Sequence, residues 1–213
     1  MKHFETRQEV VHSFGQAAKR AEFAGFDVVE IHGAHGYLLN QFISPLTNYR
    51  IDAYGSASLE TRYRIWKEVI HEVRHHFTGS VWMRISADEY SKDGTTREEF
   101  VTLVNWMQAD GVEVVDVSTG GVVPVAPLHV YPGYQTSLAA YLKQQTGATI
   151  MTVGKLGDPA LANYVIETNQ SDLVALGRPL LRNPHWVYEA AKQLNQADFK
   201  PFNESYERGY VED

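Results

Sequence analysis

Short, nearly continuous apolar runs rich in β-branched residues recur along the chain and predict buried strands. The five runs that we interpret as strands lie at residues 27–31, 81–85, 112–117, 149–153 and 172–176. Stretches with helical spacing of apolar positions lie at residues 9–23, 62–77, 96–108, 135–145 and 158–168. This alternation of helix and strand predicts an α/β fold with a parallel sheet and right-handed crossovers.

The organisation of the chain points to one domain. No composition break or linker divides residues 1–213, and we predict a single domain with a C-terminal tail at residues 195–213. A turn-rich insertion at residues 43–58 follows the first strand, and loops of that length in compact domains are usually functional. Five strand–helix units fit either an open parallel sheet or part of an eight-stranded barrel, and the pattern alone favours neither.

Composition removes several classes of function. The formal net charge of -7 gives no electrostatic footprint for nucleic acid or an anionic membrane surface. The sequence has no cysteine, which excludes disulfides, thiol catalysis and Cys-ligated metal, and it shows no membrane span or signal peptide. We therefore expect a cytoplasmic protein that binds neither nucleic acid nor a membrane.

Two imidazoles and a phenol follow the first predicted strand, in the segment His32-Gly-Ala-His35-Gly-Tyr37. Barrel enzymes place their chemistry at this end of a parallel strand, and these groups offer donors for a substrate oxygen and a source of protons. Two alternatives remain open. The residues can be ordinary loop polar groups, or a metal-dependent hydrolase can use His32 and His35, although no third ligand neighbours them in sequence.

Charged and glycine residues mark the later strands. Arg84 is a permanent cation inside an apolar run, so it needs either an internal partner, Glu30 or Asp116, or an anionic cofactor ring. The last two strands end in Gly154-Lys155 and Gly177-Arg178. Glycine admits close backbone approach and a following helix N-terminus favours anions, so the pair suggests a phosphate site, although each glycine can simply form a turn.

Eight stretches of the chain together resemble one family in order and spacing. They lie at residues 25–38, 41–50, 52–55, 62–64, 81–86, 132–135, 153–154 and 175–184. The family they resemble is the old yellow enzyme family, and within it the bacterial ene-reductases and NADPH dehydrogenases. The similarity runs over essentially the whole chain and favours the (β/α)₈ TIM-barrel type, here incomplete, with about five parallel strands equivalent to strands 4–8 and the first three missing.

The resemblance implies a role for each candidate residue. His32 and His35 would bind the carbonyl oxygen of the substrate, and Tyr37 would donate a proton to its α-carbon. Arg84 would lie against the N1–C2=O edge of FMN. The residues implied to hold the FMN phosphate are Val153, Gly154, Gly177 and Arg178. In one subclass a C-terminal arginine enters the active site of a neighbouring subunit, and Arg208 matches it, although a frayed terminus is an equal alternative.

The implied function is an FMN-dependent oxidoreductase that uses NADH or NADPH to reduce the C=C bond of α,β-unsaturated carbonyl compounds. The alternative is a non-catalytic partial barrel, or a fragment that needs a separate N-terminal half to bind FMN. An incomplete parallel barrel exposes unpaired strand edges, which invite association. We therefore expect a homo-oligomer or a complex with a complementing N-terminal half.

Overall fold

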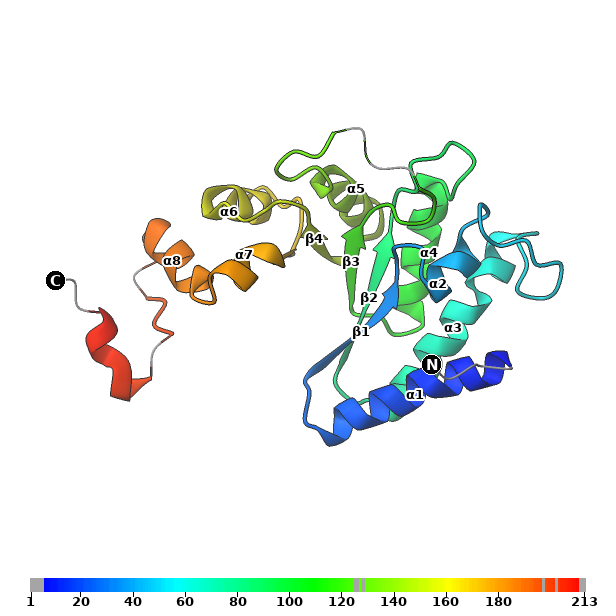
Figure 1. Ribbon diagram of the computed structural model, residues 1–213, viewed down its shortest axis with the longest axis horizontal. Coiled ribbons are helices and arrows are strands. Elements are labelled where there is room, and N and C mark those ends of the chain that lie inside the picture. The colour runs from blue at the N-terminus through cyan, green and yellow to red at the C-terminus, as the bar shows by residue number, and fades with distance from the viewer. Residues whose placement is uncertain (1–5, 125–126, 128, 197, 202, 211–213) are drawn as a thin grey trace.

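The five predicted runs form one sheet in the computed structural model, which describes residues 6–124, 127, 129–196, 198–201 and 203–210. The strands are β1 (Val28–Gly33), β2 (Ser80–Ser86), β3 (Val114–Ser118), β4 (Thr149–Val153) and β5 (Leu173–Ala175). They lie side by side in chain order, and every pair is parallel (Figure 1). The predicted parallel α/β sheet is confirmed.

Helices alternate with these strands. They are α1 (Arg7–Phe23), α2 (Leu38–Ile43), α3 (Leu59–His76), α4 (Arg97–Ala109), α5 (Thr136–Thr146), α6 (Pro159–Glu167), α7 (Arg178–Arg182) and α8 (Trp186–Gln193), followed by the 3₁₀ segment η1 (Glu204–Tyr210). The five predicted helices are present, with ends shifted by at most three residues. The sequence did not predict α2, α7 and α8, which are too short for helical periodicity to stand out.

Local sequence explains where the long helices begin. Thr6, Ser58 and Thr96 each cap a helix, and the residue three positions later returns a side-chain hydrogen bond to the cap. Such capping boxes satisfy two of the backbone N–H groups that a helix leaves without partners. After α1 the chain turns through Gly25, whose φ of 76° lies in the left-handed region expected from the sequence.

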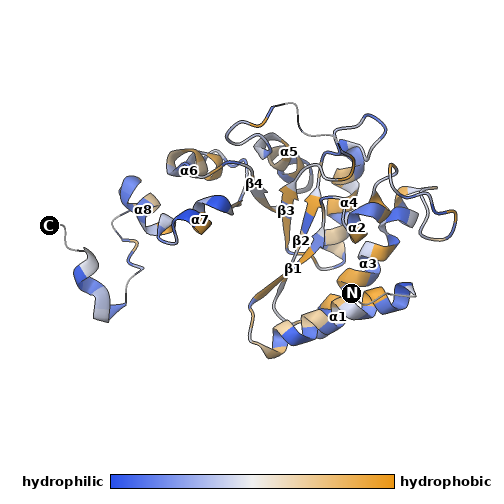
Figure 2. Cartoon of the chain, viewed as in Figure 1, coloured by the Kyte–Doolittle hydropathy of each residue, from blue (hydrophilic) through white to orange (hydrophobic). Residues whose placement is uncertain are grey.

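The main core lies between the sheet and helices α3, α4 and α5. Alternate residues of β2 and β3, such as Met83, Ile85 and Val117, are buried against these helices. Trp66 of α3 and Phe100 of α4 fill the same core and are at most 1% exposed. Figure 2 shows apolar residues gathered on the strands and on α3. Because side chains alternate across a strand, the remaining residues of the sheet face the opposite side.

That opposite face is polar near the carboxyl ends of the strands. His32 of β1 pairs in register with Arg84 of β2, and Arg84 pairs with Asp116 of β3. Three chemically active side chains therefore lie in one row across neighbouring strands. At the two sides of the sheet, β1 and β5 each pair with one strand among the described residues.

The C-terminal elements extend away from the sheet. Figure 1 shows α7, α8 and η1 running outward from the β5 side. The indole nitrogen of Trp186 anchors α8 by donating to the carbonyl oxygen of Gly157 at 2.9 Å. Leu181 and Val187 are 85% and 47% exposed, so this part of the chain carries apolar side chains that the described residues leave uncovered.

Candidate functional site

The carboxyl ends of the parallel strands meet at one edge of the sheet, and most predicted site residues lie there. His32 is the penultimate residue of β1. The chain then turns through His35, which adopts a left-handed φ of 60°, and Gly36, with φ of 73°. A Cβ at Gly36 would lie 2.0 Å from the carbonyl oxygen of Gly121, so only glycine fits where these two loops meet. Tyr37 is the N-cap residue of α2.

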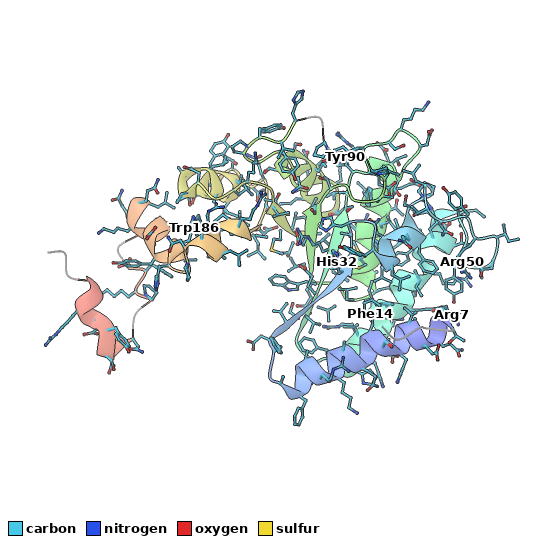
Figure 3. The ribbon with its side chains drawn as sticks, viewed as in Figure 1. Arg7, Phe14, His32, Arg50, Tyr90 and Trp186 are labelled. Carbon is cyan, nitrogen blue, oxygen red and sulfur yellow. The ribbon has the colours of Figure 1, made fainter. Side chains whose placement is uncertain are left out.

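This turn brings the three predicted catalytic residues together. The ring centroids of His32 and His35 lie 5.3 Å apart, and the rings of His32 and Tyr37 are separated by the same distance. Tyr37 is 64% exposed, so most of the residue faces solvent. Figure 3 shows His32 on β1 near the middle of the molecule, well apart from Trp186 on α8.

Both imidazoles have lowered pKa values, which favours their neutral form. Burial, with the nearby Arg84 charge and His32 as smaller causes, lowers the pKa of His35 to about 4. The pKa of His32 is also lowered, first by burial and then by Arg84. A neutral imidazole has one donor and one acceptor nitrogen, so each ring can offer one N–H to an oxygen.

Arg84 meets the internal partner that its sequence context predicted. Its Nε lies 3.0 Å from Oδ2 of Asp116, which is 2% exposed. Burial raises the pKa of Asp116 to about 6, and Arg84 opposes that shift. On β1, the side of Glu30 that faces the sheet loses hydration although the residue as a whole is exposed, and this loss together with the Asp116 charge raises the pKa of Glu30 to about 7, again opposed by Arg84. The charge of Arg84 therefore acts on both carboxyl groups, although Arg84 makes an ion pair with Asp116 alone among the described contacts.

One cleft joins Arg84 to both glycine turns. It has a volume of about 710 Å³, and Val153, Gly154, Gly177 and Arg178 line it together with Arg84. The structure thus brings together all five residues for which a cofactor role was predicted. Arg84 and Arg178 are far apart in the sequence but line the same cleft, because β2 and β5 belong to the same parallel sheet.

The lining of this cleft suits a ligand that carries a phosphate. Among the described residues it contains four cationic side chains and one carboxylate, namely Arg84, Lys155, Arg178, Arg182 and Asp158. Gly154 has a φ of 129°, and a Cβ there would meet Gln135 Nε2 at 2.9 Å. A Cβ at Gly177 would meet nothing within 4 Å, so the chain there leaves open space beside the cations. Glycine lets a phosphate approach the backbone closely.

Two residues without a predicted role also line the cleft. Ser118 ends β3 and is 4% exposed, and Gln135 precedes α5 and is 2% exposed. Ser118 Oγ lies 2.8 Å from His35 Nε2, and Gln135 donates to the carbonyl oxygen of Val153 at 2.8 Å. The sequence could have identified Ser118 as a site residue by its position at the end of a strand. For Gln135 the sequence offered no such signal beyond its place in one of the stretches that resemble the old yellow enzyme family.

Arg208, which was predicted to enter the active site of a neighbouring subunit, lies apart from the cleft of its own chain. It lies in η1, where it is exposed, and Figure 1 shows η1 far from the sheet. Within the described part of the chain, no three His, Asp or Glu residues are grouped so as to hold a metal ion. No helix among the described residues is both long and apolar enough to span a membrane.

Comparison with known proteins places this geometry in a family. The model of the family described as NADH:flavin oxidoreductase / NADH oxidase matches residues 1–197. An NADPH dehydrogenase of Halalkalibacterium halodurans is 43% identical over 203 residues, which cover 95% of this chain and 59% of the relative. An NADPH dehydrogenase of Geobacillus thermodenitrificans is 46% identical over 95% of this chain and 58% of the relative. The chain therefore spans less than two thirds of these relatives.

Solved structures give the same result. Morphinone reductase in complex with tetrahydroNAD matches with a TM-score of 0.71 and 27% identity, over 98% of this chain and 56% of that chain. A 2-naphthoyl-CoA reductase matches with a TM-score of 0.81 and 23% identity, over 88% of this chain and 29% of the other, which supports the fold alone. The five strands thus correspond to part of a TIM barrel of the old yellow enzyme type, as predicted.

Proposed function

This chain belongs to the NADH:flavin oxidoreductase / NADH oxidase family. We propose that it acts, alone or as part of a complex, as an FMN-dependent oxidoreductase that uses NADH or NADPH to reduce α,β-unsaturated carbonyl compounds. One observation carries the proposal. The cleft that holds Arg84 also holds both glycine turns, and the two neutral histidines with Tyr37 lie at the same edge of the sheet. A cofactor site and a substrate site are therefore adjacent.

Different residues of the cleft would bind different parts of FMN. Gly154 and Gly177 let the phosphate approach the backbone, and Arg178 supplies a positive charge beside it. Arg84 would present a permanent cation to the flavin ring, which would favour the negative charge of the reduced cofactor. Asp116 keeps the guanidinium in place from the neighbouring strand. When bound, FMN supplies the hydride chemistry that no side chain of this sequence can perform.

The substrate is bound and protonated by His32, His35 and Tyr37. The histidines donate hydrogen bonds to its carbonyl oxygen, which lowers the energy of the charge that develops there. Their lowered pKa values favour the neutral form, in which each ring donates through one N–H rather than acting as a positive charge. Tyr37 gives its phenolic proton to the α-carbon. Its exposed position at the start of α2 lets an enone approach the phenol from solvent, beside the histidine rings.

The phosphate assignment has a direct test. FMN and riboflavin differ by the phosphate alone, so titration of the purified chain with each ligand, followed by flavin fluorescence, isolates the contribution of the phosphate. We expect Arg178→Gln to weaken FMN binding by about tenfold to a hundredfold, equivalent to about 1.5–3 kcal/mol for a hydrogen bond to a charged group, and to leave riboflavin binding unchanged. Arg97→Gln, an exposed change on α4, is the matched control. Equal losses for both ligands, or no loss for either, would contradict the assignment.

A second candidate function rests on the two sides of the sheet. Strands β1 and β5 each present one unpaired edge among the described residues, and Leu173 of β5 is 36% exposed. Unpaired edges favour association. The partner is a second copy of this chain or a separate polypeptide that supplies further barrel strands, and in the second case this chain binds FMN only in the complex.

Light scattering coupled to size exclusion, with and without FMN, separates these cases. A dimer or larger assembly that retains flavin after desalting supports self-association. A monomer that binds flavin only after a polypeptide with the N-terminal strands of a relative is added supports the complementing fragment. A monomer that retains stoichiometric flavin without any addition would refute the need for a partner.

A further inference from the structure

A chain of hydrogen bonds connects His35 to the end of β4. Nε2 of His35 lies 2.8 Å from Ser118 Oγ. Ser118 Oγ in turn donates to Oε1 of Gln135 at 3.3 Å, and Nε2 of Gln135 donates to the carbonyl oxygen of Val153 at 2.8 Å. The residues at the two ends of this chain are a proposed substrate ligand and a proposed neighbour of the FMN phosphate.

The backbone end of this chain determines the direction of every bond in it. A carbonyl oxygen can only accept, so the atom of Gln135 that faces Val153 must be its NH₂ group. The amide oxygen of Gln135 then faces Ser118 and Thr119, and Thr119 Oγ1 also lies 2.6 Å from it. An amide oxygen can only accept, so both hydroxyl groups must donate to it.

This direction leaves one role for the histidine ring. The single proton of Ser118 points to Gln135, so the remaining capacity of its oxygen is to accept. Nε2 of His35 must therefore carry a proton. The neutral ring has one proton, and the pKa of His35 is lowered to about 4 by burial and by Arg84, so Nδ1 is left without one.

A side branch supports the same direction. The hydroxyl of Tyr90 donates to Thr119 Oγ1 at 2.6 Å, which directs the proton of Thr119 toward Gln135. The amide oxygen of Gln135 thus receives two donors, which fills both of its lone pairs. Gln135 and Ser118 are 2% and 4% exposed, so water has little access with which to replace either bond.

We propose that Gln135, acting through Ser118, is a positioning residue that selects the Nε2–H tautomer of His35. The inference deepens the proposed function, because it states which nitrogen of His35 can donate to a substrate oxygen. Ser118 lines the cleft, so the proton of His35 lies on the side of the ring that faces the cleft. A substrate oxygen that replaces Ser118 as the acceptor meets a donor already in place, with no transfer of the proton between ring nitrogens.

The test reads the tautomer directly. The ligand-free chain is labelled with ¹⁵N on its histidine rings, and long-range ¹H–¹⁵N correlation spectra are recorded near neutral pH. The signals that disappear in His35→Gln identify His35. We expect wild-type protein to show the Nε2–H pattern. Gln135→Met has similar length but no acceptor, so the hydroxyl of Ser118 becomes able to donate to Nε2, and the single-tautomer pattern is lost.

Three further variants complete the design. Ser118→Ala removes the acceptor and is expected to lose the pattern as well, which tests the proposal independently if Gln135→Met fails to fold. Thr119→Val removes only the side branch and is expected to keep the pattern. Gln145→Met, at an exposed position of α5, controls for the substitution itself. An Nδ1–H pattern in the wild type, or an unchanged pattern in folded Gln135→Met and Ser118→Ala, overturns the proposal.

Failure of this proposal and failure of the proposed function give different results. The tautomer is measured without flavin or substrate, so a chain that never binds FMN can still show the Nε2–H pattern. Conversely, FMN titration reports on the phosphate site, whatever the protonation of His35.

Discussion

The buried carboxyl of Asp116 makes the stability of this protein depend on pH in a predictable direction. Asp116 is 2% exposed, and its pKa is raised from 3.8 to about 6. A raised acid pKa means that the folded state binds the proton more tightly than the unfolded state does. The associated stability is therefore fully present below about pH 4 and is lost as the pH rises through about 6.

The size of this effect follows from the shift. At about 1.4 kcal/mol per pKa unit, the rise from 3.8 to about 6 corresponds to about 3 kcal/mol in full, of which about 2 kcal/mol is lost between pH 4 and pH 7. Asp116→Asn removes the titrating group, so the variant should lack this loss. Because the Asp116 charge also raises the pKa of Glu30, both proteins should carry Glu30→Gln.

Urea unfolding at several pH values from 4 to 7 measures the difference. Other groups titrate alike in both proteins, so the free energy of unfolding of Glu30→Gln minus that of Glu30→Gln/Asp116→Asn isolates Asp116. This difference should fall by about 2 kcal/mol as the pH rises across the range. A difference that stays constant, or that grows with pH, would refute the conclusion that burial outweighs the attraction of Arg84 for Asp116.

Three further predictions concern the core, the loop contact and the proton donor. Leu103→Ala, at a position that is 0% exposed, should lower the free energy of unfolding by about 2–5 kcal/mol in urea titrations, whereas Leu181→Ala at an 85% exposed position should change it by less than about 0.5 kcal/mol. Gly36→Ala should cost at least about 1–3 kcal/mol, because φ is 73° and the new Cβ would meet backbone, and a stability equal to wild type would contradict the tight loop contact. Tyr37→Phe should slow substrate reduction in stopped-flow measurements by about a hundredfold or more and spare flavin reduction by NADPH, with Tyr49→Phe, at an 83% exposed position, as control. Equal slowing of both half-reactions would remove Tyr37 from the role of proton donor.

Much of the fold was predictable because its signals are local. Buried parallel strands require continuous apolar runs, and the runs at β1 and β4 gave strand positions within two residues of those observed. The helices with capping boxes were also found. The short helices α2 and α7 were not, because α2 is held by tertiary contacts such as the bond from Trp66 Nε1 to the carbonyl oxygen of Leu39, and α7 has only five residues.

The candidate site divides in the same way. His32, His35 and Tyr37 lie within six residues of one another, so their proximity follows from the sequence alone. The single-residue signals at Arg84 and at the two glycine turns indicated chemistry, but their meeting in one cleft depends on the parallel arrangement of β2, β4 and β5.

The sequence by itself determined the order of helices and strands along the chain, the kinds of side chain available and the family that they resemble. Only the tertiary structure decided that Arg84 pairs with Asp116 rather than Glu30, and that His35 meets Ser118, 83 positions away. The physical reason is the separation in sequence over which each interaction acts. Periodicity and capping act over a few neighbouring residues, whereas the register of a parallel sheet sets which distant side chains come within hydrogen-bonding distance.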